Sequence, residues 1–168
     1  MNAGSYKPTN FPWILNSENP DDPDSPGGIV VVATAEAALN IGDAVYISAA
    51  HSANKSTTAS LYQGRAGFVV GGKNTQMLVM QDDGMVGKAA AAAGEQVLIC
   101  VAGKCKAVAD GAITLGTPVT NDNTTAGRVE TATITTASAD GDNGRILGIA
   151  LETTTTAGDK FLVLVTPS

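Results

Sequence analysis

The chain has 168 residues and a formal net charge of −6, from 10 basic and 16 acidic side chains. This acidic balance excludes a surface built to neutralise phosphates, so nucleic acid is not an expected partner. The length suits one ordinary domain or two small ones that share a core. Because aromatic residues make up 4% of the chain and 19 residues are glycine, we expect that core to consist of small side chains. The chain has no signal-peptide pattern at its start and no apolar run of roughly 18–20 residues, so we expect synthesis in a cytosol and no membrane partner.

Residues 1–28 differ in composition from everything that follows. Five of the seven prolines lie there, so this segment is not expected to form a helix or a central strand. Disordered segments are usually poor in aromatic residues, yet this one holds three of the seven. We therefore predict an extended, Pro-rich N-terminal arm that docks on another subunit; the alternative is that it folds back on its own body. The docking side chains that we predict are Tyr6, Phe11, Trp13, Ile14 and Leu15.

From residue 29 onward the sequence is typical of β-structure, with short runs of Val, Ile and Thr that end at Gly, Asp or Asn. The predicted strands are 29–34, 43–48, 65–70, 76–81, 95–101, 104–109, 117–121, 128–135, 145–151 and 160–165. The alanine-rich tract 88–93 is too short for a stable helix, so at most one helical turn is expected there. Many short strands favour an all-β fold, and we predict an antiparallel β-sandwich or barrel for the body, residues 29–168.

An internal repeat organises this body. Three pairs of segments match each other: 39–45 with 113–119, 64–69 with 144–149 after a one-residue adjustment, and 93–99 with 157–163. We therefore predict that the body consists of two related β units, at about 36–83 and 110–168. Chance recurrence in a chain rich in Gly, Ala and Thr is the alternative. Whether the units form one barrel or two stays open.

Residues 67–74 nearly match the spacing of a phosphate-binding P-loop. The Ser or Thr that would bind magnesium is replaced by Asn74, the residues between the glycines have the composition of a strand, and no helix pattern follows. We interpret the segment as a strand that ends in a Gly-Gly-Lys-Asn turn, and we expect no nucleotide.

The remaining candidate sites are also incomplete. Residues 140–144 begin like a calcium loop, but Leu151 stands where the bidentate glutamate should be. We interpret this segment, 82–84 and 121–123 as turns whose side chains cap their own backbone, with a single weakly held cation as the alternative. His51 is the only histidine and no nucleophile motif is present, so we expect no enzyme, no catalytic residue, no metal site and no cofactor.

Cys100 and Cys105 flank a segment that we interpret as a hairpin with its turn at Ala102-Gly103. In that register the cysteines would lie opposite each other, with Cα atoms about 4.5 Å apart, which permits a disulfide. We predict reduced thiols in a cytosol, with later oxidation as the alternative.

A spacing of glycine and valine recurs in the C-terminal half of the chain. Its segments are Ala93-Gly94-Glu95, Ile113-Thr114-Leu115-Gly116-Thr117-Pro118-Val119, Gly144-Arg145-Ile146-Leu147-Gly148-Ile149-Ala150, and Ala157-Gly158-Asp159 before Val163-Leu164-Val165. The pattern, over about residues 87–167, resembles the small capsid cement, or head decoration, proteins of tailed bacteriophages. Residues 36–80 look like a more divergent copy, and the arm has no counterpart in the pattern.

The resemblance implies a structural virion protein that binds the major capsid protein on the outer capsid surface and stabilises the expanded shell. It also implies self-association, commonly as a homotrimer, and assembly in the host cytoplasm. Two other classes stay open, a tail or fibre structural protein and a glycan-binding β-sandwich. The second would need exposed aromatic residues, and the body offers Tyr46, Tyr62, Phe68 and Phe161.

Overall fold

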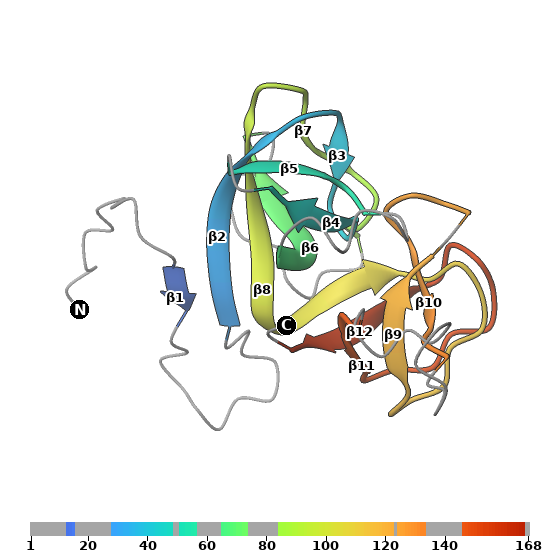
Figure 1. The fold of residues 1–168 in the computed structure, drawn as a ribbon. Helices are drawn as coiled ribbons and strands as arrows, with labels where there is room; N and C mark the ends of the chain where they lie inside the picture. The colour runs from blue at the N-terminus through green and yellow to red at the C-terminus, as the bar shows by residue number, and fades with distance from the viewer. Residues whose placement is uncertain are drawn as a thin grey trace.

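The computed structural model describes residues 13–15, 28–48, 51–56, 65–73, 84–122, 124–133 and 146–166. Within these ranges the chain forms strands and turns and no helix, which confirms the predicted all-β class (Figure 1). Accordingly, this part of the chain contains no helix that could cross a membrane. The strands are β1 (Trp13–Leu15), β2 (Gly28–Ala35), β3 (Leu39–Asn40), β4 (Ala44–Ile47), β5 (Ser52–Lys55), β6 (Arg65–Gly72), β7 (Ala89–Ala91), β8 (Gln96–Val108), β9 (Pro118–Asn121), β10 (Val129–Thr131), β11 (Gly148–Ala150) and β12 (Lys160–Val165).

Five strands close into a barrel in the first part of the chain. Their order is β2-β5-β4-β6-β8, and β2 pairs back with β8 to complete the ring. The pairs are antiparallel except that β2 and β5 run parallel, where Thr34 lies opposite Ser52. A five-stranded barrel has a narrow interior, which suits the small inward side chains of β2, Ala33 and Ala35. Of the two predicted architectures, the structure therefore has the barrel.

Strand β8 is continuous over 13 residues and bends sharply near its middle (Figure 1). Gly103 has a φ of 106°, a conformation that glycine adopts without strain. Residues before the bend pair with β2 and β6, and residues after it pair with β12. The predicted hairpin at Ala102-Gly103 is therefore wrong: each part of β8 finds its partners on other strands, so the two parts do not pair with each other.

The second part of β8 begins another five-strand arrangement. Its order is β8-β12-β11-β9-β10, and an isolated parallel bridge between Ala109 and Val129 connects the last strand with the end of β8. This arrangement has the same strand order as the barrel, with four antiparallel pairs and one parallel contact. We call β2, β4, β5, β6 and residues 96–101 of β8 the N-terminal unit. Residues 103–108 of β8 with β9, β10, β11 and β12 are the C-terminal unit.

The two units repeat each other's turn hydrogen bonds. The Gly94 N–H donates to the Ala35 carbonyl at 2.7 Å, and the Gly158 N–H donates to the Ala109 carbonyl at 2.8 Å. A second matching pair runs from Gly42 to the Val69 carbonyl and from Gly116 to the Ala150 carbonyl. All four glycines have φ between 83° and 91°. These bonds show which residue of one unit corresponds to which residue of the other, whereas the predicted bounds of the arm and of the repeat stay predictions.

Buried side chains form two clusters. One fills the interior of the N-terminal unit and includes Val45, Val69, Val97 and Ile99. The other fills the C-terminal unit and extends onto the outer face of the N-terminal unit. From that outer face it takes Val30, Ala44, Phe68 and Cys100. The barrel is therefore packed on both of its surfaces at the place where the units meet.

Short elements account for most other differences from the sequence prediction. Residues 89–91, in the tract where at most one helical turn was expected, form β7, because they pair with β3 beside Leu39. Neither β3, β5 nor β7 was predicted. The predicted strand 76–81 lies outside the described residues.

Candidate functional site

Three of the five predicted docking residues lie in β1, and Tyr6 and Phe11 lie outside the described residues. Strand β1 pairs antiparallel with the start of β2, where Ile14 lies opposite Ile29. The arm thus adds an edge strand to its own chain, as in the alternative that the sequence left open. An exposed strand edge can also pair with an extended segment of another chain. Docking of the arm on another chain therefore stays a prediction.

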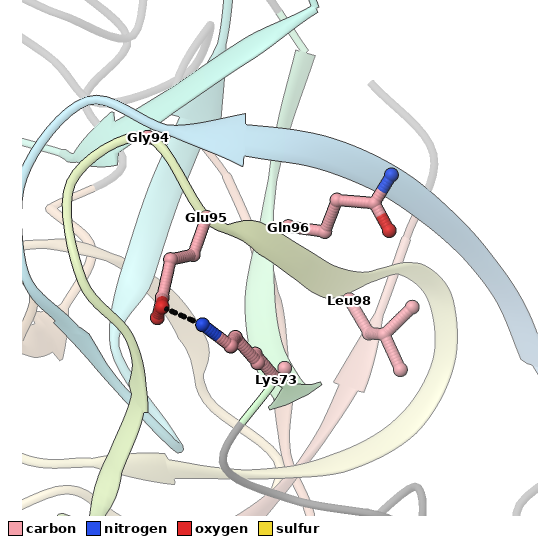
Figure 2. A pocket seen from close by; sticks show the side chains of 6 residues that line it. Lys73, Gly94, Glu95, Gln96 and Leu98 are labelled. Atoms are coloured by element: carbon pink, nitrogen blue, oxygen red, sulfur yellow. Dashed lines mark hydrogen bonds and ion pairs between the residues drawn. The ribbon is translucent and has the colours of Figure 1, made fainter.

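A pocket of about 460 Å³ lies where β6 ends and β8 begins. Its described lining residues are Gly72, Lys73, Gly94, Glu95, Gln96 and Leu98. Figure 2 shows the side chains of Lys73 and Glu95 pointing toward each other, with Nζ 2.7 Å from Oε1. The other Glu95 oxygen accepts the Ala92 N–H at 2.9 Å, so Glu95 also caps its own turn. A turn and an ion pair therefore build the wall of this pocket.

The ion pair between Lys73 and Glu95 determines the electrostatics of the pocket. The hydrogen bond from Lys73 holds the pKa of the Glu95 carboxyl below its usual range, and the same bond raises the pKa of Lys73. Both groups are therefore charged and paired at neutral pH. The described lining residues include no His, Cys, Ser or Thr, so Lys73 and Glu95 are the charged groups of this lining.

The P-loop-like segment lies in a strand. Gly67 and Gly72 belong to β6, and the lysine of the motif, Lys73, is held by Glu95. A Cβ atom at Gly67 would stand 2.5 Å from the Cys100 carbonyl oxygen, so this glycine serves a close approach between strands. The interpretation as a strand that ends in a turn is confirmed through Lys73.

Asn121 is the last residue of strand β9, so the turn interpretation is wrong there, but it is confirmed at Asp122. Its Oδ2 accepts the Thr124 N–H and hydroxyl at 2.9 and 2.8 Å and also accepts the Thr125 N–H. Burial acts to raise the pKa of Asp122, but these hydrogen bonds outweigh it and hold the pKa below its usual range. No three His, Cys, Asp or Glu side chains of the described residues gather as metal ligands. Residues 82–83 and 140–144 lie outside the described ranges.

Both cysteines are buried free thiols on opposite sides of the bend in β8. Cys100 belongs to the outer face of the N-terminal unit, and its Sγ donates to the Ala102 carbonyl at 3.2 Å. Cys105 belongs to the interior of the C-terminal unit, where burial raises the pKa of its thiol well above the ordinary value. A protonated, enclosed thiol reacts slowly, so Cys105 acts as a packing group.

The contact between the units is an apolar face. Its residues, which we call the covered face, are Val30, Ala44, Phe68 and Cys100. All four are 0% exposed, and they are neighbours across strands: Cys100 lies opposite Val30 and Phe68, and Ala44 lies opposite Phe68. The core of the C-terminal unit continues onto them, so the contact between the units is apolar and fully buried.

Among the described residues, five large apolar side chains are more than a third exposed. They are Ile29, Val32, Leu115, Ile149 and Leu164. Ile149 and Leu164 lie directly opposite each other on β11 and β12. Pro118 lies opposite Ile149 and Lys104 lies opposite Leu164, and we call these four residues the open face. The sequence analysis missed this face, although its match of 64–69 to 144–149 aligned part of it with the covered face.

Of the comparisons with known proteins, the one with solved structures gives a match. No family model matches the chain, and no curated protein matches it. Among solved structures, the chain is similar to one described as "The crystal structure of head fiber gp8.5 N base in bacteriophage phi29". The two are 12% identical over 82% of this chain and 92% of that chain, with a TM-score of 0.42. A likeness at this level carries no argument about function.

Proposed function

We propose that the protein is a structural component of a bacteriophage virion: a cement protein that binds the outer capsid surface and stabilises the expanded shell. Its partners in this proposal are the major capsid protein and further copies of itself, as a homotrimer. It assembles in the host cytoplasm, needs no cofactor and has no catalytic role.

The observation that carries the proposal is the structural role of the glycines in the cement-protein pattern. Gly94 and Gly158 have positive φ in matching turns, and each donates its N–H across the unit. Gly148 lies so close to β12 that a Cβ atom there would stand 2.2 Å from the Leu164 carbonyl oxygen. The pattern that resembles the cement family therefore encodes the β unit itself, and it supports the same use of that unit.

The construction of the body also suits a bracing protein. One continuous strand, β8, belongs to both units, and one buried cluster spans them, so no flexible linker separates the two. Strand β1 shows that arm backbone can add to a sheet edge, and residues 1–12 before it can reach about 40 Å when extended. A rigid body with an extended arm fits a protein that connects neighbouring shell subunits.

The test is co-sedimentation of the purified chain with expanded, undecorated heads of its source phage. We expect saturable binding at a stoichiometry related to the capsid symmetry. A chain that lacks residues 1–27 keeps Gly28, which pairs with Gly103, and it should bind with much lower occupancy. A full-length chain with Leu115→Ala, an exposed site outside the arm, is the matched control. No binding at micromolar concentrations would contradict the proposal, and unchanged occupancy without the arm would contradict the docking role of Tyr6, Phe11, Trp13, Ile14 and Leu15.

A further inference from the structure

The covered face and the open face correspond residue by residue. In the N-terminal unit, Cys100 on the last strand lies opposite Phe68 on one side and Val30 on the other. In the C-terminal unit, Leu164 lies opposite Ile149 and Lys104 in the same way. With the turns aligned as above, the corresponding residues are Val30 and Lys104, Ala44 and Pro118, Phe68 and Ile149, and Cys100 and Leu164.

These corresponding faces differ in what covers them. The face on the N-terminal unit is 0% exposed, because the C-terminal unit packs on it. On the C-terminal unit, Ile149 is 38% exposed and Leu164 is 37% exposed. The same backbone arrangement thus presents a corresponding face in each unit. Within one chain, only the face on the N-terminal unit is completely buried.

We propose that the open face binds the N-terminal unit of a second copy of the chain, in the way that the C-terminal unit binds the covered face. The contact is head-to-tail: two different surfaces meet, and each copy keeps one of each. The inference specifies the self-association in the proposed function, and it does not depend on capsid binding.

The surface that fills the covered face identifies the surface on the second copy. The C-terminal unit brings the end where β8 bends and β12 finishes, and Cys105 and Val165 of that end belong to the same buried cluster as Cys100. Val31 is the residue of the N-terminal unit that corresponds to Cys105, because it lies opposite Ile99 as Cys105 lies opposite Val163. The matching end of the N-terminal unit is therefore the start of β2, beside Ile29, which is 38% exposed. The docking end thus has an exposed apolar side chain of its own.

A rim contact supports the same orientation. Gly127 accepts the Ala44 N–H at 2.8 Å and donates its N–H to Ser56 at 3.3 Å, so it holds the edge of the covered face. Its counterpart is His51, which lies two residues before Ala53, the parallel partner of Ala35, as Gly127 lies two residues before Val129, the parallel partner of Ala109. Both have positive φ, 58° at His51 and 88° at Gly127. In the head-to-tail contact, His51 of one copy therefore lies beside Pro118 of the next.

The two contacts are similar in shape but not in strength. Pro118 has no N–H, so the hydrogen bond that Ala44 makes at the covered face has no equivalent at the open face. Lys104 occupies the position in the open face that Val30 occupies in the covered face, so one corner of the open face is polar. A weaker, partly polar contact suits reversible association between chains. Such head-to-tail contacts close into rings when the rotation between copies allows it, and otherwise grow into filaments.

The first experiment measures the mass of the full chain in solution from about 1 to 100 µM by light scattering and sedimentation velocity. We expect a ring of defined mass or a concentration-dependent series. Ile149→Glu/Leu164→Glu should weaken the association roughly 100-fold or more, because two unpaired charges would be buried at the contact. Leu115→Glu adds a charge at a more exposed apolar residue outside the open face and should leave the mass unchanged. A monomeric chain at 100 µM, or equal effects of both variants, overturns the inference.

A second experiment tests the orientation. A chain with both His51→Cys and Pro118→Cys should form an intermolecular disulfide ladder on mild oxidation, since the native thiols are buried. Chains with either substitution alone should not cross-link, because in a head-to-tail contact neither residue meets its own copy. Cross-linking of one single variant to itself, or an associated double variant that forms no ladder, overturns the inference. If a monomeric chain binds heads, the head-to-tail contact is overturned and capsid binding is supported. If the ladder forms but the chain does not bind heads, capsid binding is overturned and the head-to-tail contact is supported.

Discussion

The two units of the molecule have the same strand order and the same turn hydrogen bonds, yet they differ in what surrounds them. At the covered face, Phe68 is enclosed, while its counterpart Ile149 faces outward. The backbone arrangement is therefore set by the turn glycines and the close strand approaches, which the units share. The size and polarity of the outward side chains follow from what each unit packs against.

A second contrast lies at the far end of the units, in the turn before β4 and β9. Ile41 in the N-terminal unit is 1% exposed, whereas the corresponding Leu115 is 59% exposed. The N-terminal unit has the extra segment 84–91, whose Val86 packs so closely that a Cβ atom at Gly42 would stand 2.7 Å from it. At Gly116 nothing lies within 4 Å of that position. An inserted segment has thus converted an exposed turn into core.

The largest expected effect comes from truncating the covered face. Phe68→Ala should lower the free energy of unfolding by about 3–5 kcal/mol, because it leaves a cavity where the units meet. Ile149→Ala, the same position in the other unit, should cost less than about 1.5 kcal/mol in the monomer, because its side chain is already partly in water. Urea unfolding at a concentration where the chain is monomeric measures both. Equal losses would mean that the faces are equally covered within one chain.

Glycines at close strand approaches should give similar losses in both units. A Cβ atom at Gly67 or Gly148 would stand 2.5 or 2.2 Å from the carbonyl oxygen of Cys100 or Leu164. Because the blocking atoms are backbone, Gly67→Ala and Gly148→Ala should each cost about 1–3 kcal/mol in urea unfolding. Gly111→Ala is the control, since nothing lies within 4 Å of its Cβ position, and it should be nearly neutral. A large loss at only one of the two glycines would show that the units do not share this packing.

Most of the strand pattern could be predicted from the sequence, because alternation and turn residues act locally. Predicted strand 160–165 has the bounds of β12, and 29–34 lies within β2. Local patterns failed at β8, where Gly103 is typical of a hairpin turn but the partners of each part lie far away in the sequence. Alanines 89–91 likewise form a strand only because β3 is beside them.

The candidate surfaces were harder to predict than the fold. Sequence reasoning placed the docking residues in the arm, from its prolines and aromatic residues, and that role stays a prediction. It did not find the open face, because the exposure of Ile149 and Leu164 depends on which surface of the C-terminal unit packs against the N-terminal unit. The repeat aligned Phe68 with Ile149, but alignment alone does not show that one is buried and the other is not.

Two buried carboxyls should respond to pH in opposite directions. Burial raises the pKa of Asp43 above its usual range, against the opposing effects of hydrogen bonding to Asn40 and attraction to Lys55, whereas hydrogen bonds lower that of Asp122. A raised folded-state pKa means that stability is fully present below the ordinary pKa and is lost as pH rises through the folded one. A lowered pKa means that stability is present above the ordinary pKa and is lost as pH falls through the folded one.

Unfolding curves between pH 3 and pH 7 should separate these two carboxyls. Relative to Asp43→Asn, the wild type should gain stability as pH falls toward 3. At neutral pH the wild type should be more stable than Asp122→Asn by about 1.5–3 kcal/mol, the usual size for hydrogen bonds to a charged group. Part of this difference in the free energy of unfolding should be lost as pH falls toward 3. Parallel pH profiles for the two variants would contradict the opposite shifts. The position that corresponds to Asp43 in the C-terminal unit holds Thr117, which does not titrate, so the Asp43 effect belongs to one unit only.

The smallest expected effect compares two positive-φ positions that the units share. His51→Gly should raise the free energy of unfolding by no more than about 1 kcal/mol, because glycine removes left-handed strain but adds freedom to the unfolded chain. His51→Ala keeps the strain and should give no gain, so an equal gain from both would show that the imidazole, and not φ, is the cause. At the matching Gly127, Ala should instead cost about 1–2 kcal/mol from φ alone, and further stability is lost because its Cβ would stand 3.1 Å from an Asp43 oxygen. The rim of the covered face thus requires glycine, whereas the same position in the N-terminal unit tolerates a histidine that is exposed in the single chain.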